Sequence, residues 1–154
     1  MPVVNLKEFL DREGVKYVTI RHSLAYTAQE IAASAHIPGK ELAKTVVIKL
    51  DGRMAMAVLP AIHSVDLERL KQVTGAGKIE LAAEAEFKDI FPGCDIGAMP
   101  PFGNLYEMDV FVEDSIAQND EIAFNAGSHT ELIKMAYKDF ERLAKPKIER
   151  FSSS

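Results

Sequence analysis

The fold is decided by residues 43–60, which read AKTVVIKLDGRMAMAVLP. At their centre, Asp51-Gly52 is the dipeptide that a two-residue type I′ hairpin turn prefers, because both of its positions require a positive φ. The flanking segments 43–50 and 53–60 are rich in apolar residues. This pattern predicts an antiparallel β-hairpin, and the run Thr45-Val46-Val47-Ile48 is typical of a buried strand.

Regular elements are expected on both sides of the hairpin. Before it, the spacing of apolar residues predicts a helix over 5–13 that ends at Gly14, a strand over 15–22 and, after the capping pair Thr27 and Glu30, a helix that ends at Pro38-Gly39. After it, we expect a helix from Ser64 to Val73, a strand over 79–82, a helix over 83–91 and strands over 106–112 and 121–125. This order predicts an α/β or α+β fold with a mixed sheet.

The end of the chain allows two interpretations. One helix from Thr130 would place five apolar residues on one face: Ile133, Ala136, Tyr137, Phe140 and Ala144. Residues 131–135, however, also alternate between polar and apolar as a strand does. Local periodicity favours the helix. We expect residues 1–150 to form a single domain and residues 151–154 to form a flexible tail.

Length and composition exclude several classes of protein. The chain has 154 residues, of which 47% are hydrophobic and 27% charged, as in ordinary soluble globular domains. Its one cysteine, Cys94, cannot form an intramolecular disulfide, and the histidines at positions 22, 36, 63 and 129 do not have zinc-site spacing. From this spacing we expect no metal site. No signal peptide and no membrane-spanning apolar run is evident, so we expect a cytoplasmic protein.

The distribution of charge argues against a dedicated nucleic-acid-binding protein. The net charge is −5, and residues 84–121 hold 10 acidic side chains against Lys88 alone. Residues 1–60 hold 8 basic and 6 acidic side chains, and residues 134–150 hold 6 and 3. A polyanion would therefore be repelled by the middle of the chain and tolerated by its two ends. Ordinary solvated surface charge is the simpler interpretation.

Three features of the sequence are candidates for a functional site. The loop 93–103 reads GCDIGAMPPFG, in which glycines allow close approach of a ligand and prolines fix the shape. Residues 125–130, NAGSHT, follow a predicted strand, and Lys44 begins a buried one. Each also has a purely structural interpretation. The first loop can be a rigid connection, residues 125–130 can be a turn, and Lys44 can be a solvated lysine at a strand end. Ser128 and His129 are not expected to be a nucleophile and its base, because neighbours on an extended chain point apart.

Taken in order, these segments resemble the YbaK/prolyl-tRNA-synthetase-associated editing domain family. The resemblance runs from about residue 3 to Pro146 and rests on AKTVV at 43–47, on Gly97-x-x-x-Pro101 within GAMPPFG, and on NAGSHT at 125–130. It implies a compact domain with a mixed, strongly curved sheet surrounded by short helices. It also implies a strand at about 131–136 followed by a helix at about 138–144, which we accept over the periodicity.

The resemblance implies an activity and a set of site residues. Members hydrolyse the ester that links a wrongly attached amino acid to the 3′ end of tRNA, and this chain resembles a free-standing, trans-acting member. Lys44 matches the essential lysine of the family, and Gly97, Pro101, Gly127 and His129 match its two loops. The expected substrate-binding residues are Thr45, Gly97, Met99, Pro100, Pro101, Asn125, Gly127, Ser128 and His129.

The expected reaction requires little from the protein. An aminoacyl ester is already activated, so a positioned water and support for the developing oxyanion suffice. No cofactor and no metal is expected. The expected partners are mischarged tRNA and, for delivery, an aminoacyl-tRNA synthetase or an elongation factor. Two alternatives stay open: a non-catalytic module that binds an aminoacyl or nucleotide end, and a general serine hydrolase that depends on Ser128.

Overall fold

The computed structural model describes residues 6–21, 37–91, 94 and 98–153. It contains the expected hairpin, in which β2 (Leu42–Leu50) pairs antiparallel with β3 (Arg53–Pro60). Asp51 and Gly52 have φ values of 49° and 86°, the left-handed conformation that a type I′ turn requires. The helix expected behind Thr27 and the site residue Gly97 lie outside the described residues.

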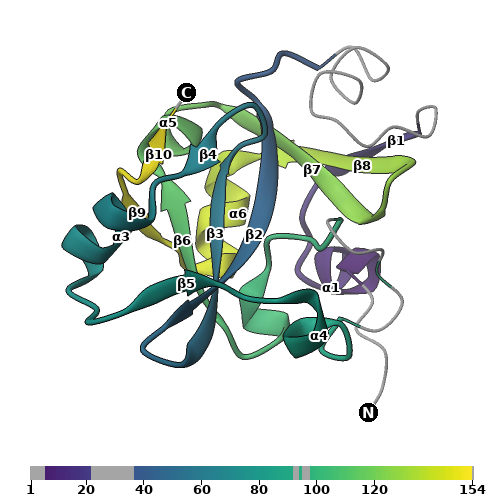
Figure 1. Ribbon diagram of the computed structural model, residues 1–154. Coiled ribbons are helices and arrows are strands. Elements are labelled where there is room, and N and C mark those ends of the chain that lie inside the picture. The colour runs from purple at the N-terminus through teal and green to yellow at the C-terminus, as the bar shows by residue number, and fades with distance from the viewer. Residues whose placement is uncertain (1–5, 22–36, 92–93, 95–97, 154) are drawn as a thin grey trace.

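The hairpin lies in the middle of a mixed sheet with the strand order β1-β8-β7-β2-β3-β6-β9. The strands are β1 (Tyr17–Arg21), β8 (Glu131–Ala136), β7 (Glu121–Ser128), β6 (Asp109–Glu113) and β9 (Lys147–Glu149), while β5 (Ile79–Leu81) pairs with the end of β2. Three pairs are parallel, β2–β7, β3–β6 and β6–β9, and the others are antiparallel. The sheet is strongly curled (Figure 1), which confirms the expected fold class.

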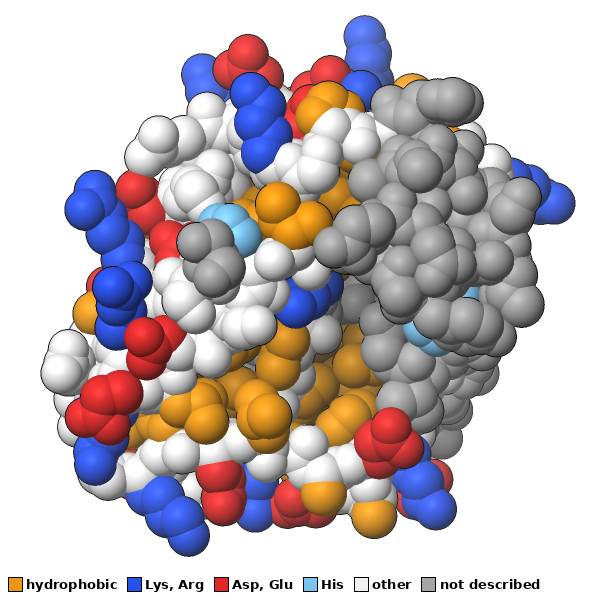
Figure 2. All heavy atoms as spheres, turned by 45° about the horizontal axis from the view of Figure 1, so that its top comes forward, with side chains coloured by type: hydrophobic (Ala, Val, Ile, Leu, Met, Phe, Trp, Pro, Cys, Tyr) orange, Lys and Arg blue, Asp and Glu red, His pale blue; other side chains and the backbone are white. Residues whose placement is uncertain are grey.

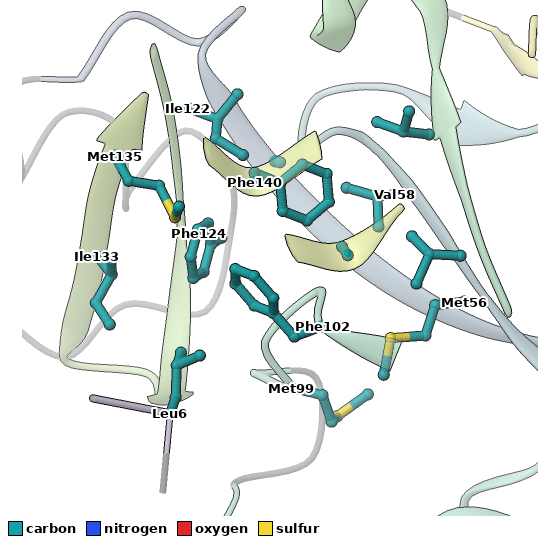
Figure 3. Packing of buried hydrophobic residues seen from close by; sticks show 14 of the residues in the cluster. Leu6, Met56, Val58, Met99, Phe102, Ile122, Phe124, Ile133, Met135 and Phe140 are labelled. Atoms are coloured by element: carbon teal, nitrogen blue, oxygen red, sulfur yellow. The ribbon is translucent and has the colours of Figure 1, made fainter. Parts of the chain in front are cut away.

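One face of the sheet encloses the main core, together with α1 (Leu6–Arg12) and α6 (Tyr137–Ala144). Phe102 is its centre: its ring makes edge contacts with Phe9, Phe124 and Phe140 at centroid distances of 5.9, 5.7 and 5.4 Å. Figure 3 shows the ring between those of Phe124 and Phe140. Edge-to-face aromatic pairs of this kind add about 0.5–1.5 kcal/mol each beyond the burial of their area.

A second apolar cluster covers the other face of β2 and β3. There Ile48, Ala57 and Leu59 pack with Leu70 from α3 (Leu67–Thr74). The helix α3 begins after Asp66, whose carboxylate accepts a hydrogen bond from the amide of Arg69, and not after Ser64 as expected. Ser64 instead begins the short strand β4 (Ser64–Val65). The helix ends at Gly75, which has a φ of 73°.

The chain between β5 and β7 departs from the sequence prediction in length. Helix α4 covers only Glu84–Phe87, and strand β6 starts at Asp109 after a 3₁₀ turn at Gly103–Leu105. A short helix, α5 (Asp114–Ala117), was not predicted. Four residues are too few for a helical period to show in the sequence.

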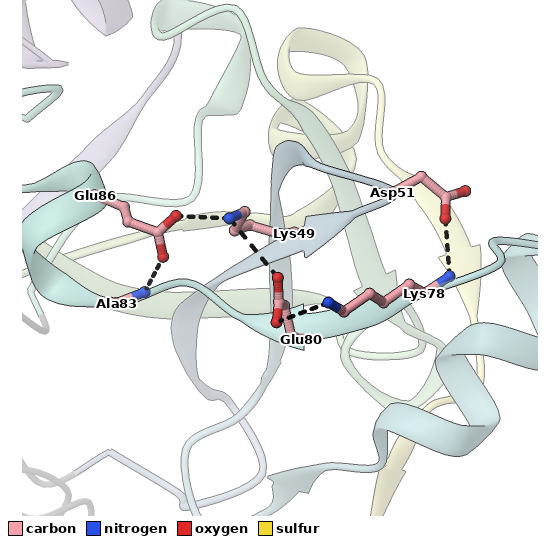
Figure 4. Close-up of polar contacts among 6 residues, drawn as sticks. All are labelled: Lys49, Asp51, Lys78, Glu80, Ala83 and Glu86. Carbon is pink, nitrogen blue, oxygen red and sulfur yellow. Dashed lines mark hydrogen bonds and ion pairs between the residues drawn. The ribbon is translucent and has the colours of Figure 1, made fainter.

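Polar contacts fasten β5 and α4 to the hairpin, as Figure 4 shows. The ammonium of Lys49 lies 2.7 Å from a Glu86 oxygen and 3.7 Å from a Glu80 oxygen, and it is the Glu86 hydrogen bond above all that raises the pKa of Lys49. The carboxylate of Asp51 accepts the amide of Lys78 at 2.8 Å. These groups are exposed or partly exposed to solvent, where ion pairs add little to stability.

Residues 151–153 are ordered, which corrects the prediction of a flexible tail for these three residues; Ser154 lies outside the described residues. Phe151 is fully buried in the second cluster, and β10 (Ser152–Ser153) pairs with β4. The buried carboxylate of Glu113 accepts the amides of Phe151 and Ser152 at 2.8 and 2.7 Å. An aromatic residue that fills the core and two charge-assisted hydrogen bonds therefore hold this segment.

Residues 131–144 form strand β8 followed by helix α6, and not the single helix that periodicity favours. The strand conformation wins because β8 pairs with a strand on each side, β1 and β7. No helix in the described part of the chain is long and apolar enough to cross a membrane.

Candidate active site

Lys44 and Asn125 lie beside each other at the point where strands β2 and β7 separate. The two strands run parallel through only two residue pairs, Leu42 with Ala123 and Ala43 with Phe124. Lys44 and Asn125 are the next residues on each strand, so their side chains lie on the same face of the sheet. Beyond them β7 continues toward β8 and away from β2 (Figure 1), and we call this point of separation the fork. Figure 2, which is turned toward the end of the molecule where β2 begins, shows a hollow with a basic side chain beside hydrophobic ones.

Lys44 is a desolvated cation. It is half-buried, and its neighbour across the hairpin is the fully buried Leu59. Burial lowers the pKa of its ammonium from the ordinary value of 10.5, since an apolar environment disfavours the charge. None of the ion pairs among the described residues includes Lys44. Within the described part of the chain, therefore, no carboxylate pairs with the charge of Lys44.

Asn125 carries the second polar group of the fork. Its carbonyl oxygen Oδ1 is buried and has no hydrogen-bond partner among the described residues. A buried acceptor without a partner costs about 1–3 kcal/mol, so such atoms are rare unless a ligand or a water completes them. A bound hydroxyl or ammonium group would supply the missing donor.

The loop that follows Ala98 is part of the core and not an exposed lid. Ala98, Met99 and Phe102 are at most 5% exposed, and Pro100 and Pro101 are also buried. At its end, a Cβ on Gly103 would lie 2.5 Å from the carbonyl oxygen of Met108, so only glycine fits there. The backbone of this loop is therefore held in one position by packing on both sides.

The two loops of the site are joined directly. The amide of Gly127 donates a hydrogen bond to the carbonyl oxygen of Ala98 at 2.9 Å. Gly127 has a φ of 96°, and a Cβ placed on it would lie 3.4 Å from the sulfur of Cys94. A side chain at Gly127 would thus be strained by its backbone and would also press on Cys94.

The turn after Gly127 is braced by short-range polar contacts. The hydroxyl of Ser128 accepts the amide of Thr130 at 3.4 Å and lies 3.3 Å from its hydroxyl. Lys7 of α1 forms an ion pair with Glu131, the first residue of β8. His129 lies half-buried in the turn between them. Ser128 is therefore engaged with Thr130 in the turn role that the sequence suggested.

The structure brings together some of the expected site residues and separates others. Lys44 and Asn125 share the fork, and Gly127 to His129 form the neighbouring turn. Thr45 points to the opposite face of the sheet, because side chains alternate along a strand, and it is 9% exposed. The Met99 side chain packs in the main core. Gly97 lies outside the described residues.

The contacts of Cys94 are ones that sequence reasoning does not reveal. Its sulfur lies against Gly127 and forms a hydrogen bond with Tyr106. Burial above all, and then Cys94, raises the pKa of the Tyr106 phenol. Tyr106 in turn stacks on Phe91 with ring centroids 4.4 Å apart. Because 33 residues separate Cys94 from Gly127, no local sequence pattern could have indicated this contact.

Comparison with known proteins places the chain in a family. Residues 22–143 match the aminoacyl-tRNA editing domain. Over 147 residues the chain is 27% identical to the multifunctional Ser/Thr-tRNA deacylase ProXp-y of Escherichia coli K12, which covers 92% of this chain and 87% of that protein. It is 26% identical over 89 residues to the proline–tRNA ligase of Bacillus mycoides KBAB4, which corresponds to 58% of this chain and 16% of the ligase.

Solved structures show the same fold. A protein described as a candidate trans-editing enzyme for prolyl-tRNA synthetase superposes with a TM-score of 0.82 and 18% identity, over 97% of this chain and 96% of that one. The hypothetical protein APE2540 superposes with a TM-score of 0.85 and 16% identity, over 97% and 100% of the two chains.

Proposed function

The chain belongs to the aminoacyl-tRNA editing domain family, and on this premise we propose that it is a deacylase that hydrolyses the ester of mischarged tRNA in trans. The observation that carries the proposal is the fork at which Lys44 lies beside Asn125. Among the described residues Lys44 forms no ion pair, and the buried Oδ1 of Asn125 has no hydrogen-bond partner. The similarity to the E. coli Ser/Thr-tRNA deacylase along nearly its whole length supports action in trans.

Lys44 supplies positive charge where the reaction develops negative charge. Water attacks the ester carbonyl, and the carbonyl oxygen becomes an oxyanion in the tetrahedral intermediate. An ammonium that is partly removed from water stabilises an oxyanion more strongly than a fully hydrated one, since bulk water no longer screens the pair. The half-buried position of Lys44, and not merely its charge, therefore suits it to this role.

Asn125 orients the substrate by accepting a hydrogen bond. We propose that its Oδ1, which has no hydrogen-bond partner among the described residues, receives either the α-ammonium of the amino acid or a ribose hydroxyl. Both groups belong to every aminoacyl-tRNA, so this contact fixes the position of the ester and does not select the amino acid. Selection falls to the turn at Gly127 to His129 and to the buried loop beside it.

The amide of Gly127 does not support the oxyanion. It already donates to the Ala98 carbonyl, and the amide of Thr130 donates to Ser128. Pro100 and Pro101 have no amide hydrogen at all. We infer that Lys44 is the main electrostatic group at the fork, because it is the group there that carries a full positive charge. The proton of the attacking water passes to the ribose oxygen that leaves when the C–O bond breaks, with the neighbouring ribose hydroxyl as relay, so no side-chain base is required.

The substrates and partners follow from the family. We expect the reaction in the cytoplasm, where tRNA is charged, with seryl-tRNA and threonyl-tRNA as the first substrates to test. The similarity to proline–tRNA ligases makes a tRNA of the proline system the first tRNA to use. Delivery by a synthetase or by an elongation factor would compensate for a net charge of −5, which disfavours independent binding of tRNA.

The test is a deacylation panel. Alanyl, seryl, threonyl, cysteinyl and prolyl esters on several tRNAs are mixed with the protein, and release of the labelled amino acid is followed beside a simple chromogenic ester. We expect release from at least one mischarged tRNA and none from correctly charged prolyl-tRNA. Hydrolysis of the chromogenic ester together with a covalent acyl-enzyme on Ser128 would instead indicate a serine hydrolase. Binding of every charged tRNA without release would indicate a non-catalytic module.

A further inference from the structure

A cavity of about 340 Å³ lies at the same end of the hairpin as the fork. Lys40, just before β2, and Pro60, the last residue of β3, form one side of it. Ser115, Gln118 and Asn119, from α5 and the turn after it, form the other. Ile62 and His63 complete the wall. The groups that meet here are an ammonium, amides, a hydroxyl, an imidazole and an apolar surface.

The charge of this cavity distinguishes it from two others on the molecule. Its described lining holds Lys40 and no acidic side chain, whereas a cavity beside β9 is lined by three acidic and two basic side chains, and a third cavity by two of each. In a chain with a net charge of −5 this matters, because a polyanion is repelled by carboxylates at the short distances of a binding site. The cavity is therefore suited to a phosphate-bearing ligand.

Several of the polar groups are held in place before any ligand binds. The amide nitrogen of Asn119 donates to the Lys40 carbonyl at 2.9 Å, and that of Gln118 donates to Asp114 at 2.8 Å. The Nδ1 of His63 lies 3.1 Å from the Ser152 hydroxyl. A fixed amide presents its carbonyl oxygen in one direction, which is how asparagine and glutamine recognise the edges of bases.

The cavity also has an apolar wall and an aromatic ring. Ile62 is 50% exposed and adjoins Pro60 at the end of β3, and the imidazole of His63 lines the same cavity. Unstacked bases stack on aromatic rings, histidine among them, while nearby amides read their edges and a lysine neutralises the phosphate. His63, the two amides and Lys40 supply these three kinds of group.

The cavity also lies at the right separation from the fork. Lys40 is four residues before Lys44, so at about 3.3 Å per residue their backbones are at most about 13 Å apart. The amide of Ala61 donates to the Leu42 carbonyl, which fastens the wall of the cavity to β2 between the two lysines. Stacked nucleotides rise about 3.4 Å each. The unpaired 3′ end of a tRNA can therefore span from the cavity to the fork.

We propose that this cavity binds the unpaired nucleotides that precede the terminal adenosine of the tRNA substrate. The proposal rests on the proposed function, and it gives the protein a second contact with tRNA, apart from the ester. Lys40 contacts a phosphate, Ile62 and Pro60 support a base, and Asn119 and Gln118 contact its edge.

Two substrates that differ only in these nucleotides test it. The full substrate is the mischarged tRNA that the protein hydrolyses best, and the short one is the same amino acid esterified to adenosine alone. For Lys40→Ala and Ile62→Ala we expect kcat/KM on the tRNA to fall about tenfold, mainly through KM, while kcat/KM on aminoacyl-adenosine changes less than about twofold. Lys138→Ala, which removes an exposed lysine on α6, is the control and should alter neither value.

Direct binding separates this proposal from the proposed function. A fluorescently labelled CCA trinucleotide is titrated with the wild-type protein and the two variants, and its anisotropy is followed. Weaker binding by Lys40→Ala and Ile62→Ala than by wild type supports the cavity even if no ester is hydrolysed. Three results would overturn the proposal. The variants could lose kcat/KM equally on tRNA and on aminoacyl-adenosine, they could lose it on neither substrate, or they could bind the trinucleotide as wild type does.

Discussion

The amide of Gly127 donates a hydrogen bond to the carbonyl oxygen of Ala98 at 2.9 Å. This bond joins the two loops of the candidate site, one of which is fixed by the aromatic core through Phe102 and the other by the hairpin of β7 and β8. The turn that carries Ser128 and His129 therefore takes its position from the core. Small changes at Gly127 should move it.

Gly127→Ala should reduce deacylation strongly, while a matched glycine elsewhere should not. Alanine at a φ of 96° costs about 1–2 kcal/mol of stability, and its Cβ would also press on Cys94 at 3.4 Å. Gly52→Ala is the control, because Gly52 has a φ of 86° but nothing within 4 Å of the added Cβ. Urea unfolding should give similar losses for both variants, and only Gly127→Ala should lose activity. Equal activity in the two would contradict a role for the turn.

The alkaline limit of the reaction should depend on Lys44. The side chain is charged below its pKa, and burial lowers that pKa, so the charge is lost at a lower pH than for an exposed lysine. The enzymatic rate, corrected for spontaneous hydrolysis, should therefore fall at alkaline pH before an ordinary lysine titrates. Lys44→Arg stays charged there and should move this limit upward. An alkaline limit that Lys44→Arg leaves in place would assign it to another group.

The same burial links Lys44 to stability. Since its pKa is lower in the folded than in the unfolded chain, the unfolded chain binds more protons between the two values, and the contribution of Lys44 to stability rises with pH across that window. Below the window the buried charge disfavours folding. Lys44→Met should therefore melt at the same temperature as wild type or higher at neutral pH, as differential scanning fluorimetry would show. A clearly lower melting temperature would mean that Lys44 serves the fold.

Asn125→Ala should weaken the site through the loss of one acceptor. A hydrogen bond that positions a substrate contributes about 0.5–1.5 kcal/mol, so kcat/KM should fall roughly two- to tenfold. Asn125→Asp should be worse, because a carboxylate next to Lys44 would form an ion pair with it and remove its positive field from the ester. The two variants should fold equally well by circular dichroism. Higher activity in Asn125→Asp than in Asn125→Ala would contradict this arrangement.

Phe151→Ala should destabilise the protein without touching the reaction. Removal of a fully buried phenylalanine costs about 3–5 kcal/mol, and here it also loosens the segment that Glu113 holds. Ser153→Ala, at an exposed position two residues later, is the control. Chemical denaturation should show the difference, while the activity of the folded fraction stays at the wild-type level. A loss below about 1 kcal/mol would restore the interpretation of a flexible tail.

The parts of the fold that local chemistry determines were predictable from the sequence. The Asp51-Gly52 turn requires two positive φ values, and few other dipeptides adopt them, so the hairpin and its register followed directly. The strand at β8 and the burial of Phe151 depend on partners far away in the chain, β1 and α3 among them, so periodicity alone misjudged both.

The candidate site also has features that the sequence indicates and features that it does not. The family resemblance predicts Lys44, Asn125 and Gly127 as site residues, and their residue types are visible in the sequence. It did not indicate that Thr45 faces the opposite side of the sheet from Lys44 or that the Gly127 amide is already used by Ala98. The contact between Cys94 and Gly127 exists only once the chain has folded. Contacts of this kind leave no local pattern, and these are the ones that shape the turn.

The most direct test of the account compares two lysines of one strand. Lys44 and Lys49 both lie on β2, but Lys49 is paired with Glu86 and Glu80 outside the fork. Single-turnover deacylation of the best mischarged tRNA is measured for Lys44→Met and Lys49→Met. We predict that Lys44→Met loses about 10²–10³-fold in rate while Lys49→Met stays within about twofold of wild type. A folded Lys44→Met that deacylates as fast as Lys49→Met would contradict the account.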